Sequence, residues 1–411
     1  MDNVTHGLIG YVLGRAAGSR LGPGAQEQPP EQDLAATHRA RRALSWTGVL
    51  ASNGPDLDLL ITPFANDPKL VYLSHHRGHT HTLLLAVPLG LAIAALVCRL
   101  LRVEGRARRL ALGLGALSAL LHIGFDALNN YGVHPFFPLS GRWFYGDTLF
   151  IVEPLLLAVM LPLPLLGAGS RAGRVTAGVL AAVLLALVWG LAPVPLTKGT
   201  AVAVTALLAL GLAVQRAFPD RAEPTLAAMA LVVGTFALLS PVAEHRVRDA
   251  LARGAPEERV LEVALAPGPG NPLCWNGFAV SAGPEDAYAV RTLELSLLPS
   301  VFAPGPCTAA PGARTAPLVP ASIEGDAGLR FGQRFQGTGA ELRALVRDYC
   351  EAEVFMNFAR VPFWRPGNPP LLGDLRYDME PEVSWAELEL NDRCTDWFAE
   401  WEPPRQDVLT P

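Results

Sequence analysis

The chain has 411 residues, of which half are hydrophobic and 17% are charged, and its formal net charge is −5. The mean hydropathy is positive, at +0.28, which predicts membrane-embedded segments. Because the net charge is small and the arginines are divided among several loops, the composition gives no electrostatic case for a nucleic-acid partner.

The apolar residues are unevenly placed along the chain. Up to about Pro241, long runs of Leu, Ala and Val alternate with short arginine-bearing loops, and beyond it charged residues, proline and glycine are spread throughout. We therefore expect an all-α multi-span membrane helix bundle over residues 1–243, followed by a small α+β soluble domain over residues 244–411. The first residues have no basic region and no cleavage site, so we expect insertion through the chain's own helices.

Two short apolar segments come first. Residues 4–18 and 43–53 are shorter than the roughly 20 residues of a full span, so each is expected to span with a tilt, to span partially or to re-enter. Residues 20–42 between them are rich in Pro, Gln, Glu and Arg and predict a flexible loop. The second segment stops at Gly54-Pro55, where proline favours a helix boundary.

Six longer apolar stretches follow a polar loop over residues 62–78. Their lengths and compositions fit transmembrane helices, some of them tilted or slightly short. We expect these spans at residues 82–101, 110–128, 149–166, 175–191, 201–217 and 226–242.

The basic residues indicate an orientation. Taken in turn, the loops on one side of the segments contain fourteen arginines, and the loops on the other side contain only Lys69, Arg77, Arg142 and Lys198. The positive-inside rule assigns the arginine-rich loops to the cytoplasm. The C-terminal domain is then expected to be extracytoplasmic.

The tail is expected to combine strands with a helix at residues 340–350. Alternating or β-branched runs predict strands at residues 259–265, 278–281, 289–297, 353–361 and 385–390. Cysteine usage suits an oxidising compartment and two disulfides, with four free thiols as the alternative. The four cysteines of the tail are Cys274, Cys307, Cys350 and Cys394.

An apolar stretch at residues 118–132 carries two ionisable side chains, His122 and Asp126. Their spacing of four residues places both on one face of a helix, where they can hold one metal ion. Ionisable groups in apolar helices are costly and usually face a bundle interior or water. A hydrogen bond between the two side chains that tightens helix packing is the alternative interpretation.

Other histidines and aspartates fall toward the same predicted outer side. Asp56 and Asp58, in an extended stretch, would lie on one side of the backbone and could bridge two cations. Mixed imidazole and carboxylate ligands favour Zn²⁺, Mn²⁺ or Fe²⁺ over Ca²⁺ or Mg²⁺. The groups expected to converge there are His6, Asp56, Asp58, His76, His79, His81, His122 and Asp126.

Each of these residues also has a simpler interpretation. His6 would be a packed or interfacial histidine, either aspartate would cap a helix, and His75 and His79 would be solvated loop residues. Arg77 is either a loop charge beside lipid headgroups or a group that binds substrate phosphate through its planar guanidinium.

Several ordered motifs carry a resemblance to a known family. They are Thr5-His6 with Gly10, Pro55-Asp56-Leu57-Asp58, His76-Arg77-Gly78-His79-Thr80-His81, His122-x-x-x-Asp126 with Asn130-Tyr131-Gly132, and then Pro138-Leu139-Ser140-Gly141-Arg142-Trp143 with Asp147. In this order they resemble the YdjM-like family of predicted membrane-bound, metal-dependent hydrolases. The resemblance covers residues 1–155 well, the later spans loosely and the tail weakly. Thr82 and Glu153-Pro154 depart from the family, in which Ser and Asp-Pro are common.

The resemblance implies a multi-pass protein of the bacterial inner membrane whose His and Asp residues bind metal, and a distant similarity to zinc-dependent phospholipases C. Zinc is the expected metal, as one or two ions, with Mn or Fe as alternatives. The ligands that the resemblance implies are His6, Asp56, Asp58, His76, His81, His122 and Asp126.

Our leading hypothesis is an integral membrane hydrolase that acts on a lipid or lipid-linked (phospho)ester at the outer membrane face. The metal would activate water, Arg77 would steady the anionic substrate, and Asp58 would be a catalytic group as well as a ligand. The main alternative is a transporter or metal-handling protein, which predicts polar residues continuing through the later spans. A non-catalytic anchor for the outer domain is a third interpretation, and it leaves the His and Asp residues unexplained.

Overall fold

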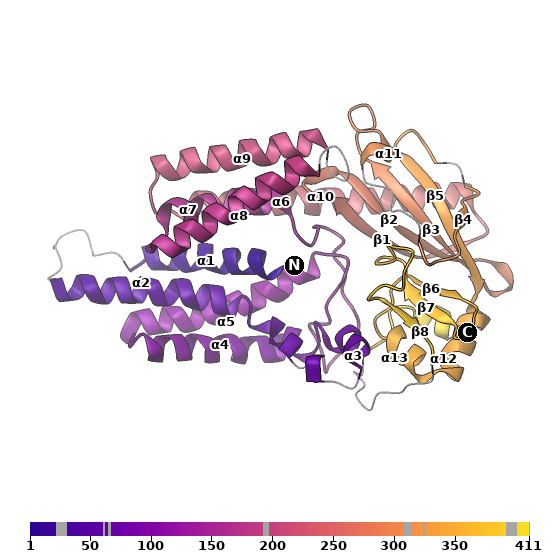
Figure 1. The fold of residues 1–411 in the computed structure, drawn as a ribbon, viewed down its shortest axis with the longest axis horizontal. Helices are drawn as coiled ribbons and strands as arrows, with labels where there is room; N and C mark the ends of the chain where they lie inside the picture. The colour runs from indigo at the N-terminus through magenta and orange to yellow at the C-terminus, as the bar shows by residue number, and fades with distance from the viewer. Residues whose placement is uncertain are drawn as a thin grey trace.

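The computed structural model describes residues 1–21, 31–60, 62–64, 67–191, 197–307, 314–323, 325–391 and 401–410. Its N-terminal region is a bundle of apolar helices, and its C-terminal region contains antiparallel sheets that lie against one end of the bundle (Figure 1). This arrangement confirms the predicted class of a helical membrane region followed by a smaller α+β region.

The two N-terminal segments form a helical hairpin. Asp2 is the N-cap of helix α1 (Asn3–Ser19), and its side chain accepts hydrogen bonds from the backbone N–H groups of Val4 and Thr5. Helix α2 (Glu31–Ala51) is longer than predicted, because residues 31–42 are helical and not part of a loop. The sequence there is rich in Ala and Arg, which are strong helix formers, and this outweighs its polar character.

Among the described residues, five helices are long and apolar enough to cross a membrane, and they correspond to five of the six predicted spans. The sixth stretch, residues 149–166, is different: its helices are α6 (Pro154–Met160) and α7 (Pro162–Gly167). Prolines at the start of each piece break what we predicted as one span. The five longer helices are α4 (Leu83–Leu100), α5 (Gly105–Ala127), α8 (Arg171–Gly190), α9 (Lys198–Ala217) and α10 (Glu223–Gly254).

Consecutive long helices are antiparallel. The helix ends that carry the arginines therefore all lie at one end of the bundle, away from the sheets (Figure 1). The segments between α2 and α4 lie at the opposite end. There the predicted polar loop instead contains a helix, α3, because Asp67 caps its first turn and proline occupies its first position. The short elements of this stretch are η1 (Pro55–Leu60), η2 (Thr62–Phe64), α3 (Pro68–His75) and η3 (His79–His81).

The tail contains two antiparallel sheets. One has the order β1-β2-β3-β5-β4 and the other β6-β7-β8. The strand predicted at residues 353–361 is wrong, because α13 covers its first part and buries Val354 and Phe355. The predicted helix is confirmed as α12, and the other four predicted strands coincide with β1, β2, β3 and β8. The bounds are β1 (Arg259–Gly268), β2 (Asn271–Ala282), β3 (Ala287–Ser296), α11 (Pro304–Cys307), β4 (Val319–Pro320), β5 (Leu329–Thr338), α12 (Gly339–Asp348), α13 (Cys350–Met356), β6 (Pro362–Arg365), β7 (Leu371–Asp374), β8 (Glu387–Glu389) and α14 (Gln406–Leu409).

Cysteines of the tail are oxidised. Cys274 and Cys307 form a disulfide, and Cys350 is also disulfide-bonded. Cys394 lies outside the described residues, and Cys98 is a free, buried thiol of α4. These bonds exclude the alternative of four free thiols in the tail.

The tail is docked onto the bundle by buried polar contacts. Arg360 forms two hydrogen bonds with Asp147, of 2.6 and 2.8 Å, and Trp401 Nε1 donates to the Ser74 carbonyl at 2.7 Å. Helix α10 runs without interruption across residue 243, where we had placed the domain boundary. One hydrophobic cluster joins Leu70, Leu73 and Tyr131 of the membrane region to the core of the tail.

Close approach of α1 and α2 depends on glycine. A Cβ atom at Gly10 would lie 2.1 Å from the Gly48 carbonyl oxygen, which belongs to the backbone and cannot rotate away. We expect Gly10→Ala to push the two helices apart and to lower the melting temperature in detergent by about 5 °C. Gly113→Ala is the matched control, because a Cβ atom there meets nothing within 4 Å; equal melting temperatures for the two variants would contradict this packing.

Candidate metal centre

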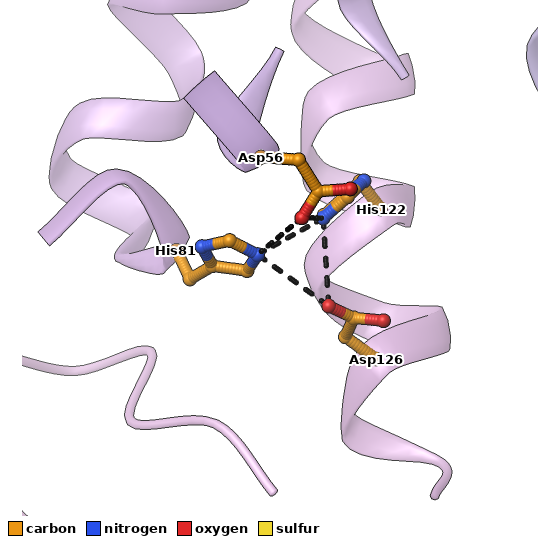
Figure 2. A group of neighbouring side chains, drawn as sticks. All are labelled: Asp56, His81, His122 and Asp126. Atoms are coloured by element: carbon orange, nitrogen blue, oxygen red, sulfur yellow. Dashed lines mark hydrogen bonds and ion pairs between the residues drawn. The ribbon is translucent and has the colours of Figure 1, made fainter. Parts of the chain in front are cut away.

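Four side chains from three separate elements point toward one another (Figure 2). These elements lie at the end of the bundle that faces the tail (Figure 1). Asp56 comes from η1, His81 from η3, and His122 and Asp126 lie one turn apart on α5. The side chains of His81, His122 and Asp126 are at most 1% exposed, and that of Asp56 is 8% exposed. The prediction that His122 and Asp126 lie on one face of a helix is therefore confirmed.

The four ligand atoms have the mutual spacing of a small coordination shell. His81 Nε2 and His122 Nε2 are 3.0 Å apart. Asp56 Oδ1 lies 3.4 and 3.5 Å from these two nitrogens, and so does Asp126 Oδ2. Donors bound to zinc at about 2.0–2.1 Å in a tetrahedron are separated by roughly 3.3–3.4 Å. Five of the six pair distances in the cluster thus fit that geometry, and the sixth is within 4.8 Å.

Hydrogen bonds behind the two imidazoles fix their orientation. His122 Nδ1 is 2.6 Å from the carbonyl oxygen of Ser52, which can only accept, so this nitrogen carries the proton. His81 Nδ1 faces a carboxylate oxygen of Asp58 at 3.3 Å. With Nδ1 engaged in this way, the Nε2 of each imidazole faces the centre. The two Nε2 atoms, 3.0 Å apart, are close enough to bind one cation together.

Asp126 gives a second indication of a cation. Its Oδ2 is buried and has no hydrogen-bond partner among the described residues. Arg77 Nε lies 3.1 Å away, but the two atoms are not aligned for a hydrogen bond. A buried carboxylate oxygen is costly without a partner. A divalent ion at the four ligand atoms would satisfy it, so these residues fit a metal.

Asp58 lies behind His81 and supports it. Its Oδ2 accepts hydrogen bonds from the Arg77 backbone at 2.9 Å and from Thr80 Oγ1 at 3.3 Å, in addition to facing His81 Nδ1. A carboxylate in this position holds a ligand histidine in one tautomer. Asp58 also belongs to a second group with Asp56 and His76, whose ligand atoms lie within 4.8 Å of one another.

The electrostatics of the short elements favour charged carboxylates beside neutral imidazoles. Burial raises the pKa of Asp56, but the neighbouring His122 and His81 outweigh this effect and hold the pKa far below its usual range. The pKa of Asp58 is lowered in the same way, against burial, by His76 and His81. Burial lowers the pKa of His76. At neutral pH Asp56 and Asp58 are therefore charged and His76 is neutral, and these are the forms that bind cations.

His6 lies beside this cluster and outside both groups. Its Nε2 is 3.1 Å from Asp126 Oδ1, and its ring stacks on His122 with the centroids 3.8 Å apart. Ser52 Oγ in turn donates to the His6 carbonyl at 2.8 Å. The structure thus places His6 where it orients Asp126. The amino group of Met1 contacts the same carboxylate oxygen.

Arg77 forms the buried wall of the centre. Its Nη1 donates to Asn129 Oδ1 at 2.9 Å and lies 3.3 Å from the carbonyl oxygens of Asp126 and Gly132. The guanidinium carbon lies 4.6 Å from the centroid of the Tyr131 ring. The residue is only 2% exposed, so it is held far more rigidly than a loop charge beside lipid headgroups.

Sequence reasoning missed several groups around the centre. The Ser52 carbonyl and Asn129 leave no chemical signature in a sequence, because many residues supply a carbonyl oxygen and Asn is common in loops. His134 is fully buried between Trp143 and Trp401, and burial lowers its pKa to about 3. His79 is exposed and contacts Phe137 and Trp401, so it lies outside both groups.

Fold and site together define a multi-span membrane protein with a buried histidine and aspartate cluster at one end of its helix bundle. Residues 1–195 match the family described as YdjM inner membrane protein. The match covers just under half of the chain, and together with the five long apolar helices it supports an inner membrane protein. It confirms the resemblance to the YdjM family seen in the motifs, but not the hydrolase and phospholipase C similarity, and it covers all four members of the cluster.

Other comparisons add nothing to this assignment. No curated protein matches the chain, and no solved structure matches it.

Removal of a central ligand tests the cluster directly. We expect His122→Ala to abolish stoichiometric zinc binding, because it removes one of four ligands and leaves the others without their shared ion. The measurement is zinc per chain by elemental analysis of detergent-purified protein. His245→Ala is the control, since the His245 side chain is 77% exposed and pairs with Asp249, away from the cluster; equal zinc content in both variants would rule out the proposed ligand set.

Asp58→Asn distinguishes a supporting residue from a ligand. The amide keeps the size of the side chain but weakens its hold on His81 Nδ1, so we expect zinc affinity to fall by roughly 10- to 100-fold. Competition with a chelating dye measures this affinity. Wild-type affinity in the variant would contradict the supporting role, and complete loss of zinc would make Asp58 a ligand.

Proposed function

We propose that this protein is a membrane-bound, metal-dependent hydrolase that acts on a lipid or lipid-linked phosphoester. The observation that carries the proposal is the set of four buried ligand atoms from Asp56, His81, His122 and Asp126, with the two imidazole nitrogens 3.0 Å apart. Zinc is the ion that this donor set favours, and the adjacent group of Asp56, Asp58 and His76 offers room for a second ion. When bound, such a cation supplies Lewis acidity toward a phosphoryl or carbonyl oxygen.

The chain's own residues supply position and charge. Asp58 and the Ser52 carbonyl hold the two imidazoles, and His6 holds Asp126. Arg77 supplies the guanidinium group that would bind an anionic substrate. Its hydrogen bond to Asn129 and its ion pair with Asp126 fix the position of this positive charge. Burial excludes bulk water from the centre and thereby strengthens each of these electrostatic interactions.

Lipid is the favoured substrate class because the ligand-bearing segment is apolar on its outer side. Leu57 and Leu60 of η1 are 47% and 64% exposed, whereas their neighbours in the chain, Asp56 and Asp58, face the candidate metal centre. Phe64 of η2 and Leu139 are 88% and 94% exposed, and α4 begins next to His81. Exposed apolar side chains around a polar centre suit the interface between lipid headgroups and acyl chains.

We place the centre and the tail on the extracytoplasmic side. The arginine-rich helix ends lie at the opposite end of the bundle, as the positive-inside rule requires for the cytoplasmic side (Figure 1). The Cys274–Cys307 disulfide in the tail supports the same orientation, because such bonds persist in oxidising compartments.

Turnover of lipid phosphoesters tests the proposal. We expect the purified protein in detergent to release a phosphorylated headgroup or free phosphate only with zinc present, and His122→Ala or Asp126→Ala to reduce the rate at least 100-fold. The His245→Ala variant controls for handling. Headgroup release is followed by mass spectrometry across a panel of phospholipids and polyprenyl phosphates.

Three results would separate the competing functions. Hydrolysis that persists in both ligand variants contradicts the proposal. Zinc binding without hydrolysis, together with zinc uptake into proteoliposomes, would instead favour the transporter. Absence of both zinc and turnover would leave the anchor.

A further inference from the structure

Four aromatic side chains form a group at the junction of the membrane region and the tail. We call this the aromatic rim, made of Tyr72, Tyr131, Tyr377 and Trp385. Trp385 lies 4.6 Å from Tyr377, 5.7 Å from Tyr72 and 6.4 Å from Tyr131, measured between ring centroids. Tyr131 and Tyr377 are 6.2 Å apart. Two members therefore come from the membrane region and two from the tail.

The aromatic rim adjoins one particular edge of the metal centre. Tyr72 stacks on His76 at 4.9 Å, and Tyr131 lies 5.6 Å from the same imidazole. His76, Asp56 and Asp58 are partly exposed, whereas His81, His122 and Asp126 are buried. Trp385 is 41% exposed at the outer side of the rim. The rim thus lies beside the edge of the centre that solvent or a substrate reaches.

Two hydroxyl groups of the rim have no hydrogen-bond partner within the described part of the chain. The Tyr131 and Tyr377 hydroxyls are buried, and neither forms a hydrogen bond with any described residue. Buried polar groups in proteins are nearly always hydrogen-bonded, so an unpaired pair at one site points to a missing ligand or water. The hydroxyl of Tyr288, a buried tyrosine elsewhere in the tail, does have a partner, since it donates to the Pro362 carbonyl at 2.9 Å.

Their surroundings make these hydroxyls donors toward an anion. Burial raises the pKa of Tyr377 to about 12, so its hydroxyl keeps its proton at neutral pH. The Arg77 guanidinium lies over the Tyr131 ring, at 4.6 Å, and adds positive charge on the same side. Arg376 of the tail lies 5.0 Å from the Tyr377 ring centroid. Protonated phenols beside fixed guanidinium groups suit the oxygen atoms of a phosphate.

We propose that Tyr377 of the tail and Tyr131 of the membrane region donate hydrogen bonds to the phosphate group of the substrate at the metal centre. The C-terminal domain then completes the active site and does more than cover it. This inference rests on the proposed function and narrows its substrate class to phosphoesters. In the alternative, the two hydroxyls bind only water and their removal leaves the affinity for phosphate unchanged.

Binding of inorganic phosphate tests this inference without turnover. We expect the full-length protein to bind phosphate in isothermal titration calorimetry, and Tyr377→Phe to bind it about tenfold more weakly, the loss expected for one hydrogen bond to a charged group. Tyr131→Phe should show a similar loss. Tyr288→Phe is the matched control, since it also removes one buried hydroxyl of a tyrosine but lies away from the rim, and its phosphate affinity should equal that of the wild type.

Zinc content and melting temperature are measured on the same samples, so that failed metal binding and failed phosphate binding are recorded separately. Wild-type phosphate affinity in Tyr377→Phe, or no phosphate binding by the wild-type protein with or without added zinc, would overturn the inference. A protein that binds phosphate through these tyrosines but hydrolyses no lipid phosphoester would support the inference and contradict the proposed function. Loss of phosphate affinity in Tyr288→Phe as well would show a general folding effect and overturn the assignment.

Discussion

The structure depends on one electrostatic constraint: two imidazole nitrogens and two carboxylate oxygens face one another in a space that water barely reaches. Proton positions on His81 and His122 are set from behind by Asp58 and the Ser52 carbonyl, so the inward nitrogens are acceptors. Four acceptors cannot stabilise one another, and a cation is the simplest group that reconciles them. The close packing of α1, α2 and α5 and the turns of η1 and η3 all serve to bring these atoms together.

The tail extends this arrangement. Its buried Arg360 pairs with Asp147, and Trp401 reaches the helix that precedes the His76–His81 element, so the tail has a fixed position relative to the cluster. Aromatic residues from both regions then meet beside the partly exposed edge of the centre. A soluble domain attached only by a linker would have no reason to share a hydrophobic core with residues next to the candidate metal ligands, whereas Leu70, Leu73 and Tyr131 lie in the core of the tail.

Local patterns predicted much of this protein, and non-local contacts account for most of what was missed. The i, i+4 spacing of His122 and Asp126 is a property of one helix, and hydropathy identifies long apolar helices, so both were readable from the sequence. Residues 149–166 contain two short helices where one span was predicted, because prolines begin each of them, and these prolines are evident in the sequence. The position of His6 against Asp126, the role of Asp58 behind His81, and the meeting of Tyr131 with Tyr377 depend on how distant segments pack, which no single segment encodes.

X-ray absorption spectroscopy of the zinc-loaded, detergent-purified protein reports directly on the atoms that bind the ion. We expect one shell of nitrogen and oxygen ligands at about 2.0–2.1 Å, with the outer-shell scattering of two imidazole rings, and no sulfur ligand. A protein that retains no zinc, or a spectrum with only water oxygens around the ion, would contradict this expectation.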